Sequence, residues 1–295
     1  MCIRDRYQIG IWAEEAQLST LLAELQIKGR VHHLEMLGRN KRGEILTLEV
    51  SVEPITLNET PCLLMTARDV SLLKNAQAQI RHLAYHDPLT NLPNRALLMD
   101  RLSQQIALLK RHNLRGALLF LDLDHFKHIN DSLGHPVGDT VLKIITARLE
   151  ASVRMEDTVA RLGGDEFVVL LSGLEGTRNE VSEQVRQLAD TLRELLSEPM
   201  FLDGQRLQVT PSIGVALIPD HGSTPTDLLK RADIALYRAK DSGRNTTQMF
   251  HNTMQKAASE RLRMETDLRL ALSRGEFSVH FQPQVDARDT VSYTH

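Results

Sequence analysis

The stretch RLGGDEFVVLL, residues 161–171, decides the fold and raises a question about its own composition. Two glycines and two acids, residues 163–166, interrupt a run of apolar residues that is typical of a sheet interior. The paired glycines predict a tight hairpin, because glycine adopts positive φ angles without steric cost. We therefore expect the strands TVARL (158–162) and EFVVLL (166–171) to pair, with Asp165 and Glu166 at the hairpin tip.

The segments around this hairpin predict an α+β fold, a central antiparallel sheet with flanking helices. Upstream we expect a helix over about 96–111, an apolar strand that ends in Asp122 and Asp124, a loop over 127–139, and a helix with Leu142 and Ile145 on its apolar face. Downstream we expect a helix over about 178–197, a strand pair within 206–218, and a helix over about 225–241. The order β-α-β-β-α-β is the ferredoxin-like arrangement.

This arrangement gives the acids of the hairpin a chemical purpose. The hairpin lies beside the strand that ends at Asp122, so Asp122, Asp165 and Glu166 meet at one edge of the sheet. Carboxylates at that distance repel one another unless a cation joins them, and carboxylate oxygens suit Mg²⁺ held jointly with substrate phosphates. For GGDE taken alone, an exposed hairpin with charged tip residues is the alternative.

Composition limits the classes of function. The 295 residues are 42% hydrophobic and 25% charged, and the net charge of −3 provides no field for nonspecific binding to nucleic acid or membranes. No apolar run reaches the roughly 18 residues of a spanning helix, and two cysteines cannot form a disulfide framework, so we expect a cytoplasmic protein with no membrane segment in this fragment. The ends, MCIRDR (1–6) and VSYTH (291–295), resemble translated sequencing adaptors, and we expect an internal piece of a longer protein.

Residues 1–70 resemble the C-terminal half of a PAS sensor domain. A helix-like segment (14–29) and a strand-like segment (31–37) precede EILTLEVSVEPITLNETPCLLMTARDV (44–70), which alternates apolar and polar residues around a turn-like NET. Leu46, Leu48, Val50 and Val52 share one face, and we expect Cys62 to be a small core residue.

Residues 71–86 contain neither glycine nor proline and predict a linker helix. Its apolar positions recur at the 3-4-3 spacing of a coiled-coil seam, at Leu73, Ala76, Ile80 and Leu83. A helix packed on its own domain is the alternative, and the sequence leaves both open.

Residues 87–250 contain five motifs in order: DPLTNLPNR (87–95), DLDHFKHINDSLGHPVGD (122–139), RLGGDEF (161–167), SIGVA (212–216) and ALYRAKDSGRN (235–245). With these motifs the segment resembles the GGDEF-domain diguanylate cyclases. It implies a nucleotidyl-cyclase palm that condenses two GTP molecules into cyclic di-GMP and releases two pyrophosphates. It also implies Mg²⁺ or Mn²⁺ as cofactor and a homodimer, because each site holds one GTP.

The resemblance also implies roles for individual residues. The metal ligands are the side chains of Asp122 and Asp165 and the carbonyl of Leu123, and the catalytic residues are Glu166 and Asp165. The substrate-binding residues are two that read guanine, Asn130 and Asp139, and three near the phosphates, Lys240, Arg244 and the weaker candidate Lys127. The RxxD pair, Arg154 and Asp157, forms the product-inhibition site.

Five of these residues also have a plain structural interpretation. Asp139 near a helix start, and Lys240 and Arg244 near a helix end, complement the helix dipole. The pair Arg154 and Asp157 has the spacing of an ordinary surface ion pair.

The last segment, 251–295, predicts a long helix over about 253–274 and a strand within EFSVHFQPQVD (276–286). Residues 268–286 resemble the opening of an EAL phosphodiesterase domain, whose defining motif lies beyond residue 295. A catalytically silent GTP- or cyclic di-GMP-binding module that regulates such a domain is therefore the alternative function.

Overall fold

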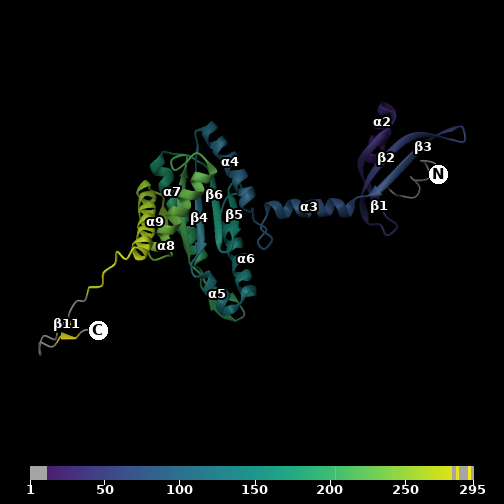
Figure 1. Ribbon diagram of the computed structural model, residues 1–295. Helices are drawn as coiled ribbons and strands as arrows, with labels where there is room; N and C mark the ends of the chain where they lie inside the picture. The colour runs from purple at the N-terminus through teal and green to yellow at the C-terminus, as the bar shows by residue number, and fades with distance from the viewer. Residues whose placement is uncertain (1–11, 203, 281–283, 286–291, 294–295) are drawn as a thin grey trace. The chain divides into compact units, whose positions relative to one another are not determined.

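The computed structural model describes residues 12–202, 204–280, 284–285 and 292–293. The chain divides into two compact units, Met1–Ala84 and Tyr85–His295, which are described separately (Figure 1). The adaptor-like MCIRDR segment lies outside the described residues, as does most of VSYTH. Among the described residues, no helix is both long and apolar enough to cross a bilayer.

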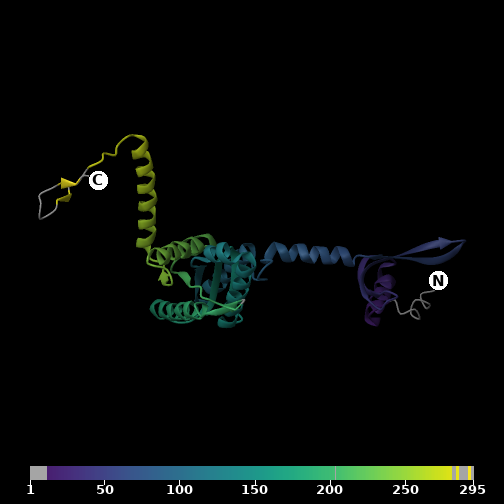
Figure 2. The same cartoon turned by 90° about the horizontal axis from the view of Figure 1, so that it is seen from below.

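The first unit is a helix on an antiparallel sheet, with α2 (Glu15–Lys28), β1 (Val31–Arg39), β2 (Ile45–Leu57) and β3 (Thr60–Asp69) in the strand order β1-β2-β3. The alternation predicted in β2 is confirmed, because Val50 and Val52 are buried against α2 and β1 residues. The prediction for Cys62 was wrong. This cysteine is exposed on β3, because the far end of the β2–β3 hairpin extends past α2 (Figure 2). The PAS resemblance stays a prediction.

The predicted linker helix is present as α3 (Ser71–Tyr85), and no residue of α3 is buried against the described part of the chain. The apolar side chains of its seam are largely exposed, with Leu73 at 54%, Ile80 at 67% and Leu83 at 59%. The alternative of a helix packed on its own domain is therefore not what the structure shows. The coiled coil stays a prediction.

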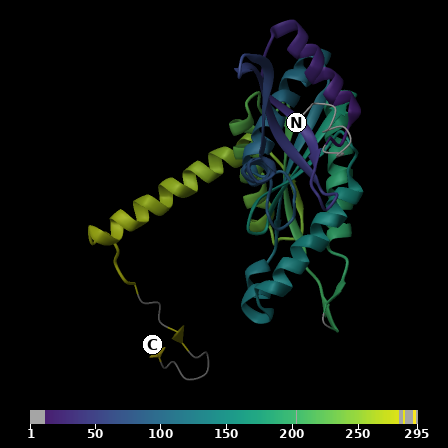
Figure 3. The same cartoon turned by 90° about the vertical axis from the view of Figure 1, so that its right-hand side faces the viewer.

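The second unit has a five-stranded sheet in the order β10-β9-β4-β6-β5, from β4 (Arg115–Leu123), β5 (Thr158–Gly163), β6 (Glu166–Leu174), β9 (Pro211–Ile218) and β10 (Thr247–Met249). Strands β9, β4, β6 and β5 pair antiparallel, and β10 pairs parallel to β9. Its helices are α4 (Arg95–His112), α5 (Phe126–Leu133), α6 (His135–Ser152), α7 (Arg178–Leu196), α8 (Pro225–Asp241) and α9 (Asn252–Ser273). The predicted ferredoxin-like order is confirmed, and a small hairpin of β7 (Met200–Leu202) and β8 (Gln205–Leu207) projects from the unit (Figure 3).

Two helical layers cover the two faces of this sheet, as Figures 1 and 2 show. The strict alternation of β4 separates them: Ala117, Leu119 and Leu121 pack with α6 and α7, whereas Leu118 and Phe120 pack with α4 and α8. Since side chains alternate along a strand, Asp122 continues the row that faces α8. The sheet's central strand therefore delivers an acid toward the end of α8.

The position of α8 depends on a close approach to β9. A Cβ on Gly214 would lie 2.2 Å from the carbonyl oxygen of Ala232 and from the amide nitrogen of Leu236, so only glycine lets α8 lie this close. The helix begins at Thr224, whose hydroxyl accepts a hydrogen bond from the Asp227 amide, and Pro225 follows at the first helical position. This packing sets the height at which Lys240, in the last turn, meets the sheet.

Two predictions of local structure were wrong. The predicted loop over 127–139 is mostly helical, since α5 and α6 cover it with a break at Gly134 (φ +86°). The apolar spacing of Phe126, Ile129 and Leu133 prevailed over the turn residues, because Phe126 anchors α5 in the core. The predicted strand over 276–286 is not present at 276–280, where no described strand lies alongside to pair with it. Within the rest of that range, Gln284–Val285 pairs with Ser292–Tyr293, and residues 281–283 and 286 lie outside the described part.

Candidate active site

The predicted hairpin lies beside β4 as expected. Glu166 is the register partner of Asp122, and Gly163 pairs with Glu166, so Gly164 and Asp165 form the two-residue tip. Gly163 (φ +143°) and Gly164 (φ +53°) have the positive angles for which the glycines were required. The Leu123 amide also donates to the Asp165 carbonyl at 3.3 Å, which ties the tip to the end of β4. The three acids therefore meet at one edge of the sheet.

Asp122 is a carboxylate whose ionised form is disfavoured by its surroundings, and the residue is only 8% exposed. Burial raises its pKa to about 6, and the negative charges of Asp165 and Glu166 act in the same direction. The Lys240 ammonium, whose Nζ lies 2.7 Å from Asp122 Oδ2, opposes this rise through its hydrogen bond and its charge. The site is therefore deficient in positive charge even with Lys240 in place.

Glu166 has a similar environment. Burial raises its pKa, and the charges of Asp233 and Asp165 add to that effect while Lys240 and Arg95 counteract it. Glu166 and Asp233 line a cavity of about 330 Å³ between α4, α8 and the sheet. Sequence reasoning missed Asp233, although its spacing of seven from Lys240 places both on one face of α8.

The donor set fits a divalent cation shared with phosphates better than one enclosed by protein. Within the described residues, no group of three or more His, Cys, Asp or Glu side chains is placed to hold a metal ion by itself. Mg²⁺ is commonly bound by one or two carboxylates together with substrate phosphates, and the raised pKa of Asp122 marks a place where added positive charge is favourable.

The two predicted guanine readers come together at the α5–α6 junction. Asn130 is half-buried on α5, and Asp139 is exposed in α6, directly after Gly138. A Cβ on Gly138 would lie 1.9 Å from Asn130 Oδ1, so the two helices are in close contact at this point. Lys127 is exposed on the first turn of α5.

The second predicted phosphate ligand follows α8. Arg244 is exposed in the turn after the helix, with a positive φ of 66° and its amide bonded to the Ala239 carbonyl. The next residue, Asn245, donates its amide to Asp124, whose carboxylate also accepts from the Thr210 and Ser212 hydroxyls. Buried Asp124 thus holds the loop that carries Arg244, a structural role that sequence reasoning did not assign.

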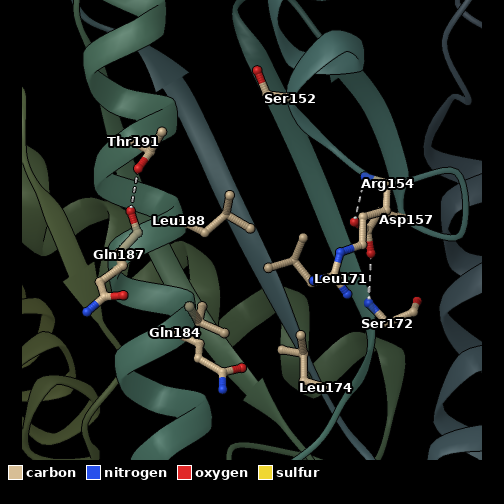
Figure 4. A pocket seen from close by; sticks show the side chains of 11 residues that line it. Ser152, Arg154, Asp157, Leu171, Ser172, Leu174, Gln184, Gln187, Leu188 and Thr191 are labelled. Carbon is tan, nitrogen blue, oxygen red and sulfur yellow. Dashed lines mark hydrogen bonds between the residues drawn. The ribbon is translucent and has the colours of Figure 1, made fainter.

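Arg154 and Asp157 do not form the simple ion pair that their spacing also allowed. The Asp157 carboxylate accepts from two backbone amides, those of Arg154 and Ser172, each at 3.0 Å. The Arg154 guanidinium is exposed, with its nearest carboxylate, Glu156, at 4.0 Å. Both residues line a cavity of about 480 Å³ whose other wall is α7, with Gln184, Gln187 and Leu188 (Figure 4).

A buried arginine, Arg161, holds the hairpin in place, and sequence reasoning missed it. Arg161 is only 8% exposed, and its Nε and Nη2 donate to the Gly164 carbonyl at 3.1 and 2.7 Å. Its Nη1 donates to Asp87 Oδ1 at 2.8 Å, which connects the hairpin to the DPLTNLPNR segment. The sequence offered one signal for this role, namely an arginine within the otherwise apolar strand TVARL (158–162).

Comparison with known proteins identifies the family. The family model described as diguanylate cyclase, GGDEF domain, matches residues 84–246. The chain belongs to the GGDEF diguanylate cyclase family. Over 213 residues it is 43% identical to the bifunctional diguanylate cyclase/cyclic di-GMP phosphodiesterase MucR of Pseudomonas aeruginosa, covering 72% of this chain and 30% of MucR. It is 42% identical over 178 residues to the diguanylate cyclase TpbB of the same species, covering 60% of this chain and 40% of TpbB.

Solved structures of GGDEF domains agree with this fold. The GGDEF domain of TpbB matches with a TM-score of 0.56 at 40% identity, covering 59% of this chain and 99% of that structure. The coiled coil and GGDEF domain of DgcB from Caulobacter crescentus, solved with c-di-GMP, matches with a TM-score of 0.53 at 29% identity, covering 61% and 93%. The chain spans less than half the length of the curated relatives named above.

Proposed function

We propose that this chain is an active diguanylate cyclase, which joins two GTP molecules into cyclic di-GMP and releases two pyrophosphates. The observation that carries the proposal is the meeting of Asp122, Asp165 and Glu166 at one sheet edge. Lys240 lies 2.7 Å from Asp122, within reach of the same edge. Carboxylates and a cation at one place are what a metal-bound triphosphate requires.

The cofactor in this proposal is Mg²⁺ or Mn²⁺, held by the carboxylates of Asp122 and Asp165 and by the Leu123 carbonyl. When bound, the metal neutralises the triphosphate and polarises the α-phosphoryl group. The raised pKa of Asp122 supports this assignment. A divalent cation would offset both the desolvation of this carboxylate and its repulsion by the two neighbouring acids.

Substrate binding in the proposal uses both ends of the site. Asn130 and Asp139 read guanine. A carboxylate accepts hydrogen bonds from the N1–H and the 2-amino group of guanine, whereas adenine has neither of these donors. Lys240 exchanges its Asp122 partner for phosphate, and Arg244 and Lys127 add positive charge near the phosphates. An ATP molecule would leave the Asp139 carboxylate unmatched, which costs about 1–3 kcal/mol.

In the chemical step, the 3′-oxygen of one GTP attacks the α-phosphorus of the other. The new P–O bond forms as the bond to pyrophosphate breaks, and Glu166 accepts the proton of the attacking hydroxyl. A pKa raised above that of an ordinary glutamate suits a general base. A second attack in the opposite sense closes the ring and releases the second pyrophosphate.

Two chains are required, because each site binds one GTP and the product contains two. A homodimer in the cytoplasm is therefore the proposed working form, and the exposed apolar stripe of α3 supports pairing through a coiled coil. Feedback inhibition is proposed at the cavity of Arg154 and Asp157, where paired donors of an exposed arginine suit a phosphate or a guanine edge.

A catalytically silent module that regulates a downstream EAL domain is the second candidate. It is favoured by one finding: the cyclic di-GMP phosphodiesterase NbdA of Pseudomonas aeruginosa is 41% identical to this chain over 214 residues, covering 72% of this chain and 26% of NbdA. NbdA is named for hydrolysis of cyclic di-GMP and not for its synthesis, so this degree of similarity is not confined to proteins named as cyclases.

The deciding experiment is to incubate the purified chain with GTP and Mg²⁺ and to separate nucleotides by chromatography. Cyclic di-GMP and pyrophosphate in a 1:2 ratio are expected, and Asp165→Ala should reduce turnover at least a hundredfold, or about 3 kcal/mol, with an unchanged melting temperature. Binding of GTP without product by the unaltered chain would support the silent module instead.

A further inference from the structure

One glycine of the second unit occupies a position where its lack of a side chain has no backbone explanation. Gly138 lies in α6, one turn after the helix starts, and its φ is not positive. Glycine is among the least favourable residues in a helix interior, and a larger residue would be the better helix former. The reason for glycine must therefore be space rather than conformation.

The space at Gly138 is filled by Asn130. A Cβ on Gly138 would lie 1.9 Å from Asn130 Oδ1 and 3.0 Å from Asn130 Cγ, distances that a real Cβ does not reach. The next neighbour, the Phe126 ring edge, lies at 3.2 Å and would need to yield only slightly. Any side chain at 138 therefore displaces the Asn130 carboxamide.

No hydrogen bond among the described residues holds that carboxamide. The Asn130 backbone carbonyl accepts from the Gly134 amide, but the side chain makes no hydrogen bond within the described part of the chain. The carboxamide instead occupies the space that a side chain at position 138 would fill. The donor and acceptor of the amide are consequently free for a ligand, and the adjacent residue in sequence is Asp139.

We infer that Gly138 is a positioning residue for base recognition: by having no side chain, it seats the Asn130 carboxamide where that group and Asp139 read guanine together. This inference rests on the proposed function, since it names the device that aims one of the two guanine readers. Gly138 itself touches no nucleotide in this account, and it acts only through Asn130.

The test compares four forms of the full chain: unaltered, Gly138→Ala, Asn130→Ala and the double variant. The probes are α,β-methylene-GTP and α,β-methylene-ATP with Mg²⁺, which cannot release pyrophosphate, and the readout is the dissociation constant from calorimetry. Gly138→Ala should weaken binding of the GTP analogue about tenfold, the loss of one good hydrogen bond, and change binding of the ATP analogue less than twofold. In the Asn130→Ala background, Gly138→Ala should change neither.

Controls separate the possible failures. Lys143→Ala, at an exposed position of α6, should bind both analogues as the unaltered chain does. If Gly138→Ala lowers the melting temperature, the double variant should restore it, because Asn130→Ala removes the two atoms in the way. A double variant that stays destabilised, or equal binding of the GTP analogue by Gly138→Ala and the unaltered chain, would overturn the inference alone. No binding by the unaltered chain would overturn the proposed function and the inference with it.

Discussion

Replacing Arg161 by alanine should destabilise the second unit and leave the first unchanged. The guanidinium connects the hairpin tip, through the Gly164 carbonyl, to Asp87 at the start of the unit. Burial tends to raise the pKa of Asp87, but hydrogen bonds from Thr90 and Arg161 outweigh it and hold that pKa below its ordinary value. The ion pair is therefore formed and stabilising at neutral pH.

The magnitude follows from what each partner loses. The Gly164 carbonyl is at an exposed hairpin tip, so water replaces the arginine at little cost. The Asp87 side chain is 15% exposed and keeps its two bonds from Thr90, so it loses one charged hydrogen bond worth about 1.5–3 kcal/mol. With the lost packing of the arginine stem, we expect about 3 kcal/mol in total. In urea this is a midpoint shift of roughly 1–1.5 M.

The chain contains its own control for this measurement. Its single tryptophan, Trp12, is half-buried and packs against the core of the first unit, so tryptophan fluorescence follows that unit alone. Circular dichroism follows both units. For Arg161→Ala, the urea transition seen only by circular dichroism should move and the fluorescence transition should not. Arg186→Ala, which removes an exposed arginine paired with Glu183 on α7, should produce no resolvable shift in either.

The same arginine should affect catalysis apart from stability. Arg161→Lys keeps the charge but loses the fork that holds the Gly164 carbonyl, so Asp165 and Glu166 are less well aimed, and we expect turnover to fall about tenfold in a folded protein. A midpoint for Arg161→Ala within 0.3 M of the unaltered chain, the order of error of such a fit, together with full activity of Arg161→Lys, would refute the role assigned to this residue.

Three further predictions concern recognition, regulation and pH. Asp139→Asn should weaken binding of the GTP analogue at least tenfold while binding of the ATP analogue stays within twofold; equal losses for both would mean that guanine is read elsewhere. Arg154→Ala should relieve inhibition by cyclic di-GMP at least tenfold in steady-state assays without lowering initial turnover, and inhibition that excess GTP overcomes would argue against a separate site. Burial, with help from the Arg178 charge, lowers the pKa of His221 to about 4, and its Nδ1 accepts from the Leu217 amide. Below its ordinary pKa of 6.5 the unfolded chain therefore binds a proton at this residue that the folded chain does not. The raised pKa of Asp122 acts in the opposite sense over the same pH range, so the measurement is a comparison of two proteins. Between pH 6.5 and 4 the free energy of unfolding of the unaltered chain should fall by about 2–3 kcal/mol relative to that of His221→Asn, which retains an acceptor and does not titrate, in urea titrations followed by circular dichroism.

Much of the fold could be predicted from the sequence, because its signals are local. The glycines at 163 and 164 predict the hairpin through their own φ preferences, and the alternation of β4 and the 3.6-residue spacing of α7 and α8 follow from burial on one face. Where local signals disagreed, as in residues 127–139, the core position of Phe126 decided in favour of a helix, which turn residues alone could not indicate. The strand predicted at 276–280 failed for the opposite reason, since a strand needs a partner that lies outside its own sequence.

The candidate site divides in the same way. The acids and cations were predicted by residue type and motif, but their electrostatics depend on distances that only folding sets: Lys240 reaches Asp122 because Gly214 lets α8 approach β9. Arg161 and Asp87 are 74 positions apart, and Gly138 is significant only because Asn130 of another helix fills its space. Sequence determined which groups the site contains, since chemistry belongs to single residues. Tertiary structure decided which groups meet, because burial, charge coupling and steric exclusion act between residues that are distant along the chain.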